Sequence, residues 1–99
     1  MSRYIFSKAA ENDLIEIYRY GFLNYGKNQA ENYVSDLKAT CQLLSTNPMM
    51  CRERKEFTPP VRIHRHKKHL IIYTIESGHI FIVRFCHERM DIAQHLENS

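Results

Sequence analysis

The most constraining feature of this sequence is a pair of β-branched and aromatic runs, 70–75 and 80–85, separated by Glu76-Ser77-Gly78-His79. Runs of this kind on either side of a Ser-Gly pair are typical of a β-hairpin with a tight turn. A turn at Ser77-Gly78 predicts the following cross-strand pairs: Ile75 with Ile80, Tyr73 with Ile82, and Ile71 with Arg84.

The alternating run Val61-Arg62-Ile63-His64-Arg65-His66 precedes the hairpin. A second tight turn at Lys67-Lys68 would make this run a third strand of an antiparallel meander. That register puts Arg62 across from Tyr73 and His64 across from Ile71.

Because side chains alternate across a sheet, these registers predict two different faces. One face, which we expect to be the core, collects Val61, Ile63, Leu70, Ile72, Thr74, Phe81, Val83 and Phe85, with Arg65 and His87 toward its ends. The other face collects Arg62, His64, His66, His69, Arg84 and Cys86 around an apolar centre of Ile71, Tyr73, Ile75, Ile80 and Ile82. A large aliphatic side chain left in water forgoes about 1.5–3 kcal/mol of burial, so this mixture indicates a binding surface. The alternative is that helices cover both faces and leave neither exposed.

Composition predicts a small globular protein of one domain, 1–99, with 43% hydrophobic and 25% charged residues. No long apolar run suggests a signal peptide or a membrane span, so we expect a cytoplasmic protein with no membrane partner. Three cysteines without C-x-x-C spacing are expected to be reduced thiols. The net charge is +3, and most of the arginine and lysine residues lie in the second half of the chain. A positive surface on one side of the protein could attract nucleic acid or an acidic protein partner.

The first half of the chain predicts a short strand at 3–6 followed by a helical hairpin. Ser7 is a suitable N-cap, and Gly26 is expected to end the first helix as a left-handed C-cap residue. The apolar stripe of the first helix is Ala10, Leu14, Ile17, Tyr18 and Gly21, and that of the second is Ala30, Tyr33, Val34, Leu37, Cys41 and Leu44. Residues 45–48 should stop the second helix, 49–60 should be a loop, and 90–96 could form a short terminal helix.

Candidate chemistry in the sequence is sparse. His64, His66 and His69 could share a strand face, but no further ligand is placed with them except Cys86, so we expect no metal and no cofactor. A phosphodiester-cleaving site could draw on cations and imidazoles at Arg62, Arg84, His64 and His87. The expected register, however, puts His87 on the core face of its strand, away from Arg62 and Arg84.

Three segments carry a resemblance to a known family: Ala9-Ala10-Glu11-Asn12-Asp13-Leu14, Tyr25-Gly26-Lys27-Asn28-Gln29-Ala30 and Arg84-Phe85-Cys86-His87-Glu88-Arg89-Met90-Asp91. With the order strand, helix, helix, meander, the chain resembles the ParE branch of the RelE/ParE toxin superfamily. The resemblance implies an α+β fold in which an N-terminal strand and a helical hairpin pack on an antiparallel sheet, with a short C-terminal helix. It also implies a type II toxin that inhibits DNA gyrase without being an enzyme.

The same resemblance implies a ParD-like antitoxin as partner, with operator DNA reached only through that antitoxin. Candidate target-binding residues are those of the family-like ending, Arg84, His87, Met90 and Asp91. Candidate antitoxin-binding residues are those of the face expected to be open, Arg62, Ile71, Tyr73, Ile75, Ile80, Ile82 and Arg84.

The alternative function is that of the RelE-like relatives, which cleave ribosome-bound mRNA. Arg62 and Arg84 could match the phosphate-binding arginines of those enzymes, with His87 as the acid-base residue. Glu88 follows His87, however, and no tyrosine follows Tyr73, whereas those relatives usually keep a tyrosine or histidine near the C-terminus.

Overall fold

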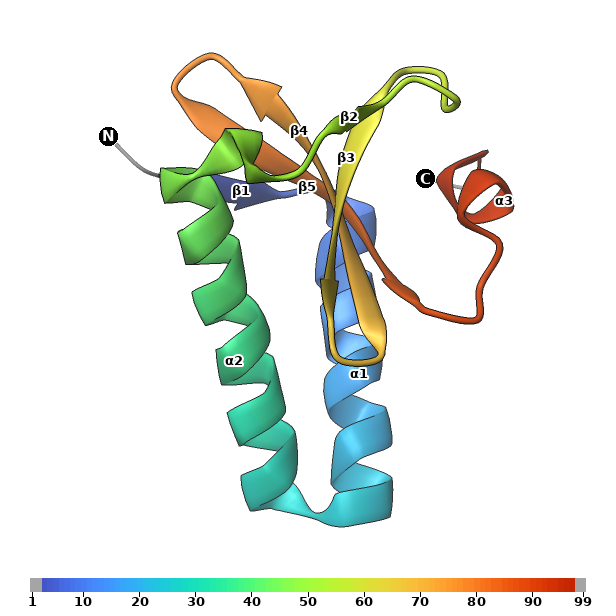
Figure 1. Cartoon of the computed structure of the whole chain (residues 1–99). Helices are drawn as coiled ribbons and strands as arrows, with labels where there is room; N and C mark the ends of the chain where they lie inside the picture. Colours follow the sequence, from blue (N-terminus) through green and yellow to red (C-terminus); the bar gives the residue numbers. More distant parts are fainter. Residues whose placement is uncertain (1–2, 98–99) are drawn as a thin grey trace.

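A mixed sheet carries a helical hairpin on one face, and the computed structural model describes residues 3–97 of the chain (Figure 1). In chain order the elements are β1 (Tyr4–Phe6), α1 (Lys8–Tyr25), α2 (Lys27–Thr46), the 3-10 helix η1 (Pro48–Met50), β2 (Glu53–Arg54), β3 (Val61–His66), β4 (His69–Glu76), β5 (His79–His87) and α3 (Ile92–Glu97). The five strands lie in the order β1-β5-β4-β3-β2. Strand β1 runs parallel to β5, and the other neighbours are antiparallel. The expected α+β class, with its helical hairpin and short terminal helix, is confirmed.

The two turns of the meander fall where the sequence predicts them. Glu76 pairs with His79 across one turn, and His66 pairs with His69 across the other. The expected pairs Tyr73–Ile82 and Arg62–Tyr73 are also present. The expectation for Ile71 and Arg84 is wrong, because the register shifts between Ile72 and Tyr73 and leaves Val83 as an extra residue on β5. Ile72 therefore pairs with Arg84, and Ile71 pairs with Phe85.

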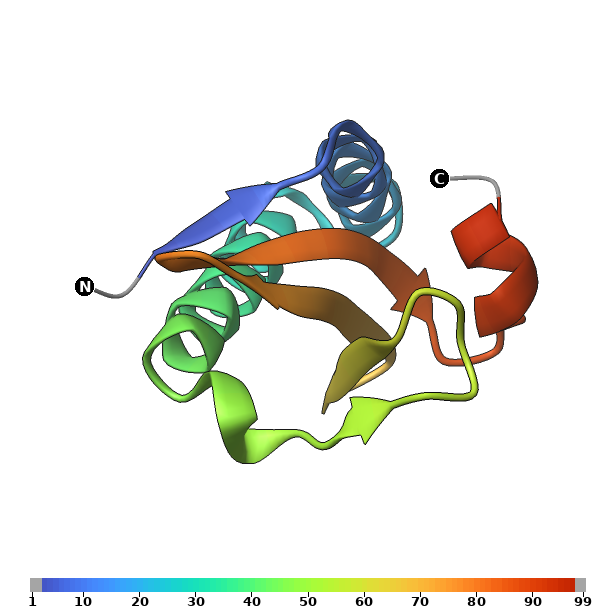
Figure 2. The ribbon, with the colours of Figure 1, turned by 90° about the horizontal axis from the view of Figure 1, so that it is seen from above.

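The face expected to be open is the face that the helical hairpin covers (Figure 2). Its apolar centre packs with Ala10 and Leu14 of α1 and with Leu37, Cys41 and Leu44 of α2. The sheet residues buried there are Ile71, Tyr73, Ile80, Ile82 and Phe85. The bulge moves Phe85 onto this face and Arg84 onto the other, which alternation through a regular strand could not predict.

The opposite face, expected to be the main core, forms a second and smaller apolar cluster. Val61, Ile72 and Cys86 are buried there. Side chains from the segment before β3 and from α3 pack over them, among them Phe57, Ile92 and Leu96. Both faces of the sheet are apolar, and alternation separates them without telling which one the long helices cover.

Local sequence explains the junction of β1 with α1. The Ser7 hydroxyl oxygen accepts a hydrogen bond from the Ala10 amide at 2.9 Å, as an N-cap should, and its hydroxyl donates to the Val83 carbonyl at 2.7 Å. The Ser7 amide donates to the Ile82 carbonyl at 2.9 Å. One residue thus starts the helix and fastens the start of the helix to β5.

The two long helices meet closely at their connected ends. Gly26 separates them with a positive φ of 94°, as expected for a glycine there, although its ψ of 171° differs from that of a left-handed cap. A Cβ at Gly21 would lie 3.3 Å from the Ala30 Cβ, so glycine permits this approach. Figure 1 shows that both helices continue well past the β3–β4 turn, which leaves the end of the hairpin uncovered by the sheet.

The segment 49–60, expected to be a loop, contains additional structure. Helix η1 includes Met49 and Met50, and Glu53 and Arg54 form the edge strand β2 against Arg62 and Val61. Such a short charged strand has no periodicity from which it could be predicted.

Tyr73 provides a test of which face is the core. Tyr73→Ala should lower the free energy of unfolding by about 3–5 kcal/mol, because it removes a fully buried ring from the main core. Urea unfolding measured by circular dichroism checks this. Tyr20→Ala, at a tyrosine that is 63% exposed, is the matched control and should change stability little. A Tyr73→Ala variant as stable as the control would contradict the assignment of the core.

Candidate functional site

An ion pair between α1 and β5 fixes the start of the C-terminal segment. The Asp13 Oδ2 atom accepts hydrogen bonds from Arg84 Nε at 2.7 Å and from the Phe85 amide at 3.0 Å, and Oδ1 accepts from Arg84 Nη2 at 2.9 Å. Arg84 Nη1 donates to the His95 carbonyl at 2.9 Å. Hydrogen bonding to Asp13 raises the pKa of the buried Arg84 guanidinium above its usual value.

The residues of the family-like ending have distinct positions in the structure. Arg84 is 8% exposed and bound to Asp13, so its guanidinium is engaged within the chain, and its expected contact with a target or an antitoxin stays a prediction. Asp91 caps α3, because its Oδ1 accepts a hydrogen bond from the Gln94 amide at 3.3 Å. His87 and Met90 instead line a groove, and Met90 is 48% exposed.

The groove lies between the uncovered part of the helical hairpin and the end of the sheet at the β3–β4 turn. It encloses about 760 Å³. Its apolar floor and tyrosines come from the helices, and its cations and imidazoles come from the sheet and its turn. The lining residues are Asp13, Glu16, Ile17, Tyr20, Gly21, Tyr25, Gln29, Ala30, Tyr33, Lys67, Lys68, His69, Phe85, His87 and Met90. A groove of this size with an apolar floor and a polar rim is suited to binding.

A cluster of aromatic rings closes one side of the groove. The Tyr33 hydroxyl lies 2.5 Å from Nδ1 of His69, and the His69 ring packs at 5.5 Å from that of His87. Lys67 Nζ lies 5.8 Å from the centre of the Tyr33 ring, a cation–π distance. Burial raises the pKa of Tyr33. Burial, followed by repulsion from His87 and His66, lowers the pKa of His69.

His66 extends this cluster along α2. Its ring lies 5.8 Å from that of Tyr33, and its Nδ1 is 3.2 Å from the Thr40 hydroxyl. Its Nε2 is buried without a hydrogen-bond partner among the described residues. Burial, followed by the charge of Lys67, lowers the pKa of His66.

The three histidines considered for a metal site have separate partners. His64 Nδ1 lies 3.6 Å from Cys51 Sγ, while His66 and His69 contact α2. Cys86 packs in the cluster on the opposite face of the sheet. Within residues 3–97 no three His, Cys, Asp or Glu side chains gather in a way that could hold a metal ion.

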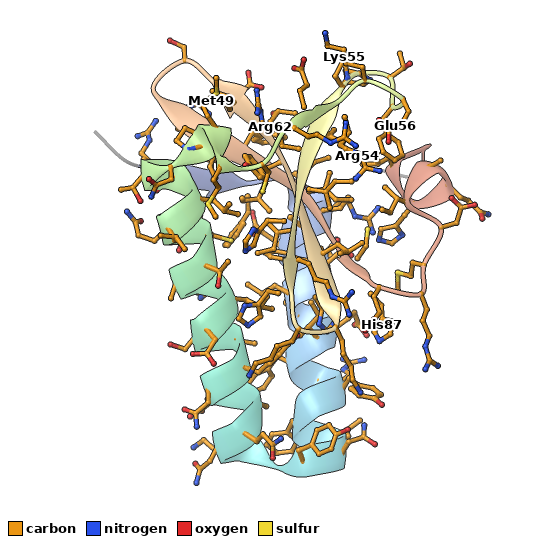
Figure 3. All side chains as sticks on the ribbon, in the orientation of Figure 1. Met49, Arg54, Lys55, Glu56, Arg62 and His87 are labelled. Carbon is orange, nitrogen blue, oxygen red and sulfur yellow. The ribbon has the colours of Figure 1, made fainter. Side chains whose placement is uncertain are left out.

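The residues of the alternative nuclease site do not converge. Arg62 Nη1 donates to the Cys51 carbonyl, and Arg62 lies at the opposite end of the sheet from His87 (Figure 3). Arg84, on β5, is bound to Asp13 of α1 and so is held in a separate contact. Arg62, Arg84 and His87 therefore do not surround one place where a phosphate could sit.

Most of the expected antitoxin-binding residues are core residues, so the expectation that they lie on an open face is wrong, and their contact with an antitoxin stays a prediction. Ile71, Tyr73, Ile80 and Ile82 are buried under the helices. Ile75 is 41% exposed at the far turn. No residue pattern predicted the groove or the contacts of Asp13 and Tyr33, because these contacts join residues far apart in the chain. The sequence did contain one signal for the groove: two tyrosines, Tyr20 and Tyr25, lie near the end of a helix that stops at Gly26.

Comparison with known proteins identifies the family. The family model of the ParE toxin of the type II toxin-antitoxin system parDE matches residues 4–92. The chain is 33% identical over 96 residues to Toxin ParE1 of Mycobacterium tuberculosis, covering 96% of this chain and 98% of the relative. The chain belongs to the ParE toxin family.

Further relatives span the same length. Toxin ParE of Escherichia coli is 29% identical, covering 97% of this chain and 94% of the relative. Toxin ParE1 of Caulobacter vibrioides is 27% identical, covering 97% and 99%. A solved structure, the chromosomal ParDE TA system from P. aeruginosa, shares the fold with a TM-score of 0.75 at 20% identity, covering 88% of this chain and 96% of that chain. Among residues 3–97 of this ParE toxin, no helix is both long and apolar enough to cross a membrane.

The ion pair of this ParE toxin gives a stability prediction. Asp13→Ala should lower the free energy of unfolding by about 3–5 kcal/mol, because it leaves the buried Arg84 without its countercharge. Glu16→Ala on the same helix is the control, since Glu16 and Arg19 form an exposed pair at 3.9 Å and should contribute about 0.5 kcal/mol or less. Denaturant unfolding of both variants checks this, and equal losses would contradict the role given to Asp13.

The histidine cluster gives a pH prediction. The folded state disfavours protonation of His66 and His69, so the unfolded state binds more protons once the pH falls below the ordinary value of 6.5. Stability should be complete above pH 6.5 and decrease as the pH falls toward the lowered folded values. Urea midpoints measured between about pH 7.5 and about pH 5 check this. His66→Gln should flatten the dependence, whereas His79→Gln at the far turn should preserve it.

Proposed function

We propose that this chain acts as a single toxin domain in the cytoplasm, that it inhibits DNA gyrase by binding rather than by catalysis, and that a ParD-like antitoxin neutralises it. Membership of the ParE family over residues 4–92 supports this proposal. The observation that carries it is the groove, because apolar side chains, tyrosines and cations meet there on one surface.

The arrangement of charges favours binding over cleavage of RNA. Phosphodiester cleavage needs an acid, a base and cations around one phosphate. Arg84 is held by Asp13, and Arg62 is held by the Cys51 carbonyl at the other end of the sheet (Figure 3). The two arginines from which the alternative enzyme would be built are thus used for structural contacts.

The groove is the proposed antitoxin site, in place of the sheet face that the helices bury. Tyr20 and Tyr25 are 63% and 58% exposed, and they stand beside the small residues Gly21 and Ala30. Tyrosines next to a floor of small residues suit an apolar segment of a partner. Lys67 and Lys68 on the opposite wall suit acidic residues of the same segment.

The C-terminal segment is the proposed gyrase-contacting element. Arg84 and Asp91 hold this segment in place, since Arg84 binds the His95 carbonyl and Asp91 caps α3. Met90 lies between these anchors with about half of its surface exposed. An exposed flexible thioether on a fixed segment is well suited to contact a partner protein.

Met90 and Met49 allow a matched test of this element. Met90→Ala should raise the toxin concentration needed for half-inhibition of gyrase supercoiling by about tenfold, the loss expected when an interface anchor is truncated. Met49→Ala, at a 72% exposed methionine on η1, should leave the inhibition unchanged. Plasmid supercoiling by purified gyrase gives the measurement.

The same assay addresses the antitoxin and the alternative function. A ParD-like antitoxin should relieve the inhibition by wild-type toxin, and Tyr20→Ala should require more antitoxin for equal relief. Cleavage of ribosome-bound mRNA in cell-free translation, abolished by Arg62→Ala or His87→Ala while supercoiling is untouched, would overturn the proposal in favour of the nuclease.

A further inference from the structure

His69 and His87 form a pair of imidazoles in the groove to which the proposed antitoxin and gyrase contacts give no chemical role. Both rings line the groove, and they pack edge to face at 5.5 Å with an angle of 83° between their planes. His69 is the first residue of β4 and pairs with His87, the last residue of β5. The pair therefore lies where two central strands of the sheet begin and end.

The hydrogen bonds of the two rings leave Nε2 of each ring for a ligand. Nδ1 of His87 accepts the Arg89 amide at 3.2 Å, so the proton of the neutral ring is on Nε2. Nδ1 of His69 lies 2.5 Å from the Tyr33 hydroxyl, and a protonated His69 ring carries a proton on Nε2 as well. Each ring can therefore present an Nε2–H donor to the groove.

Charged groups from every neighbouring element surround the pair. The turn contributes Lys67 and Lys68, and β5 continues into Glu88, which is bound to Arg65 at 2.8 Å. Helix α1 contributes Asp13, which is neutralised by Arg84, and Glu16 on the far wall. His66 adds a further imidazole beyond Tyr33. Positive charge and N–H donors therefore predominate on the sheet side of the groove.

We propose that His69 and His87 form a carboxylate-binding site, and that the group it binds is an acidic side chain of the antitoxin segment seated in the groove. This inference rests on the proposed function, which it extends by naming the chemistry of one contact. A carboxylate has two oxygens that accept hydrogen bonds, and the two rings supply one N–H donor each. Lys67 and Lys68 contribute attraction to the same charge.

The surroundings favour a carboxylate over the phosphates of a nucleic acid. No arginine is among the described residues that line the groove, and Arg65 and Arg84 are bound to Glu88 and Asp13, so the groove wall itself offers no guanidinium fork to a phosphate. A phosphate chain running along the groove would also meet Glu16 on the α1 wall. A peptide can place one acid at the histidines and an apolar side chain over Gly21 and Ala30.

Such a site takes up protons when it is filled. A bound carboxylate favours the charged imidazole and counteracts the burial and the histidine repulsion that lower the pKa of His69. Affinity should therefore rise as the pH falls, by up to about tenfold for each unit by which the ligand raises the pKa of His69.

The test uses the full chain alone, with sodium acetate as the probe and sodium phosphate and sodium chloride at equal ionic strength beside it. Acetate should shift the imidazole resonances of His69 and His87 in nuclear magnetic resonance spectra, and the shift should saturate at lower acetate as the pH falls. His87→Ala should weaken acetate binding at His69 by at least about threefold, the loss of about one hydrogen bond. His79→Ala, at an exposed histidine on the far turn, should leave it unchanged.

Several results would overturn the inference. One is no response to acetate, and another is a response that His79 shares in the wild-type protein. Binding of phosphate without binding of acetate would assign the site to a phosphate-bearing ligand instead. Because the titration contains neither gyrase nor antitoxin, a silent titration beside intact inhibition of supercoiling rejects this inference alone.

Discussion

The contact between Asp13 and Arg84 determines how the two halves of this ParE toxin fit together. Strand β1 covers β5 only as far as Ile82, so the β5 backbone beyond that point has no neighbouring strand on that side. The Asp13 carboxylate accepts the Phe85 amide there and binds the Arg84 guanidinium through both oxygens. Arg84 in turn holds the His95 carbonyl. One buried ion pair thus joins α1, the open edge of β5 and α3, and its cost of burial is offset by the number of hydrogen bonds it completes.

This contact also changes how the family-like ending should be understood. Arg84 and Asp91 stabilise the end of the chain, the first through Asp13 and the second as the cap of α3. His87 and Met90 are then left on the surface of the groove. A motif that reads as one functional unit in the sequence therefore divides into two residues that build the segment and two that a partner can reach.

The sequence predicts the local parts of this structure well and the long-range parts poorly. Turn residues and alternation locate both hairpin turns and most of the register, and helical spacing identifies the buried stripe of α2. The bulge at Val83 moves Arg84 from one face to the other, and no residue pattern marks it. The ion pair of Asp13 with Arg84 and the contact of Tyr33 with His69 join residues 71 and 36 positions apart. Such contacts depend on how helices dock on the sheet, which periodicity does not determine.

Exposed apolar surface remains in this structure, but not on the sheet face where the sequence predicted it. Once the helices cover the isoleucine-rich face, the large exposed side chains are found elsewhere. Tyr20, Leu23 and Tyr25 are all more than half exposed at the end of the helical hairpin. That end extends past the β3–β4 turn, so the sheet cannot bury these residues (Figure 1). A hairpin cut to the length of the sheet would avoid exposing them, and the extra turns contribute little to the core. The extension instead builds one wall of the groove opposite His69 and Lys68. The uncovered end of the hairpin thus presents exposed apolar side chains beside the groove, and contiguous apolar surface of this kind is typical of interaction sites.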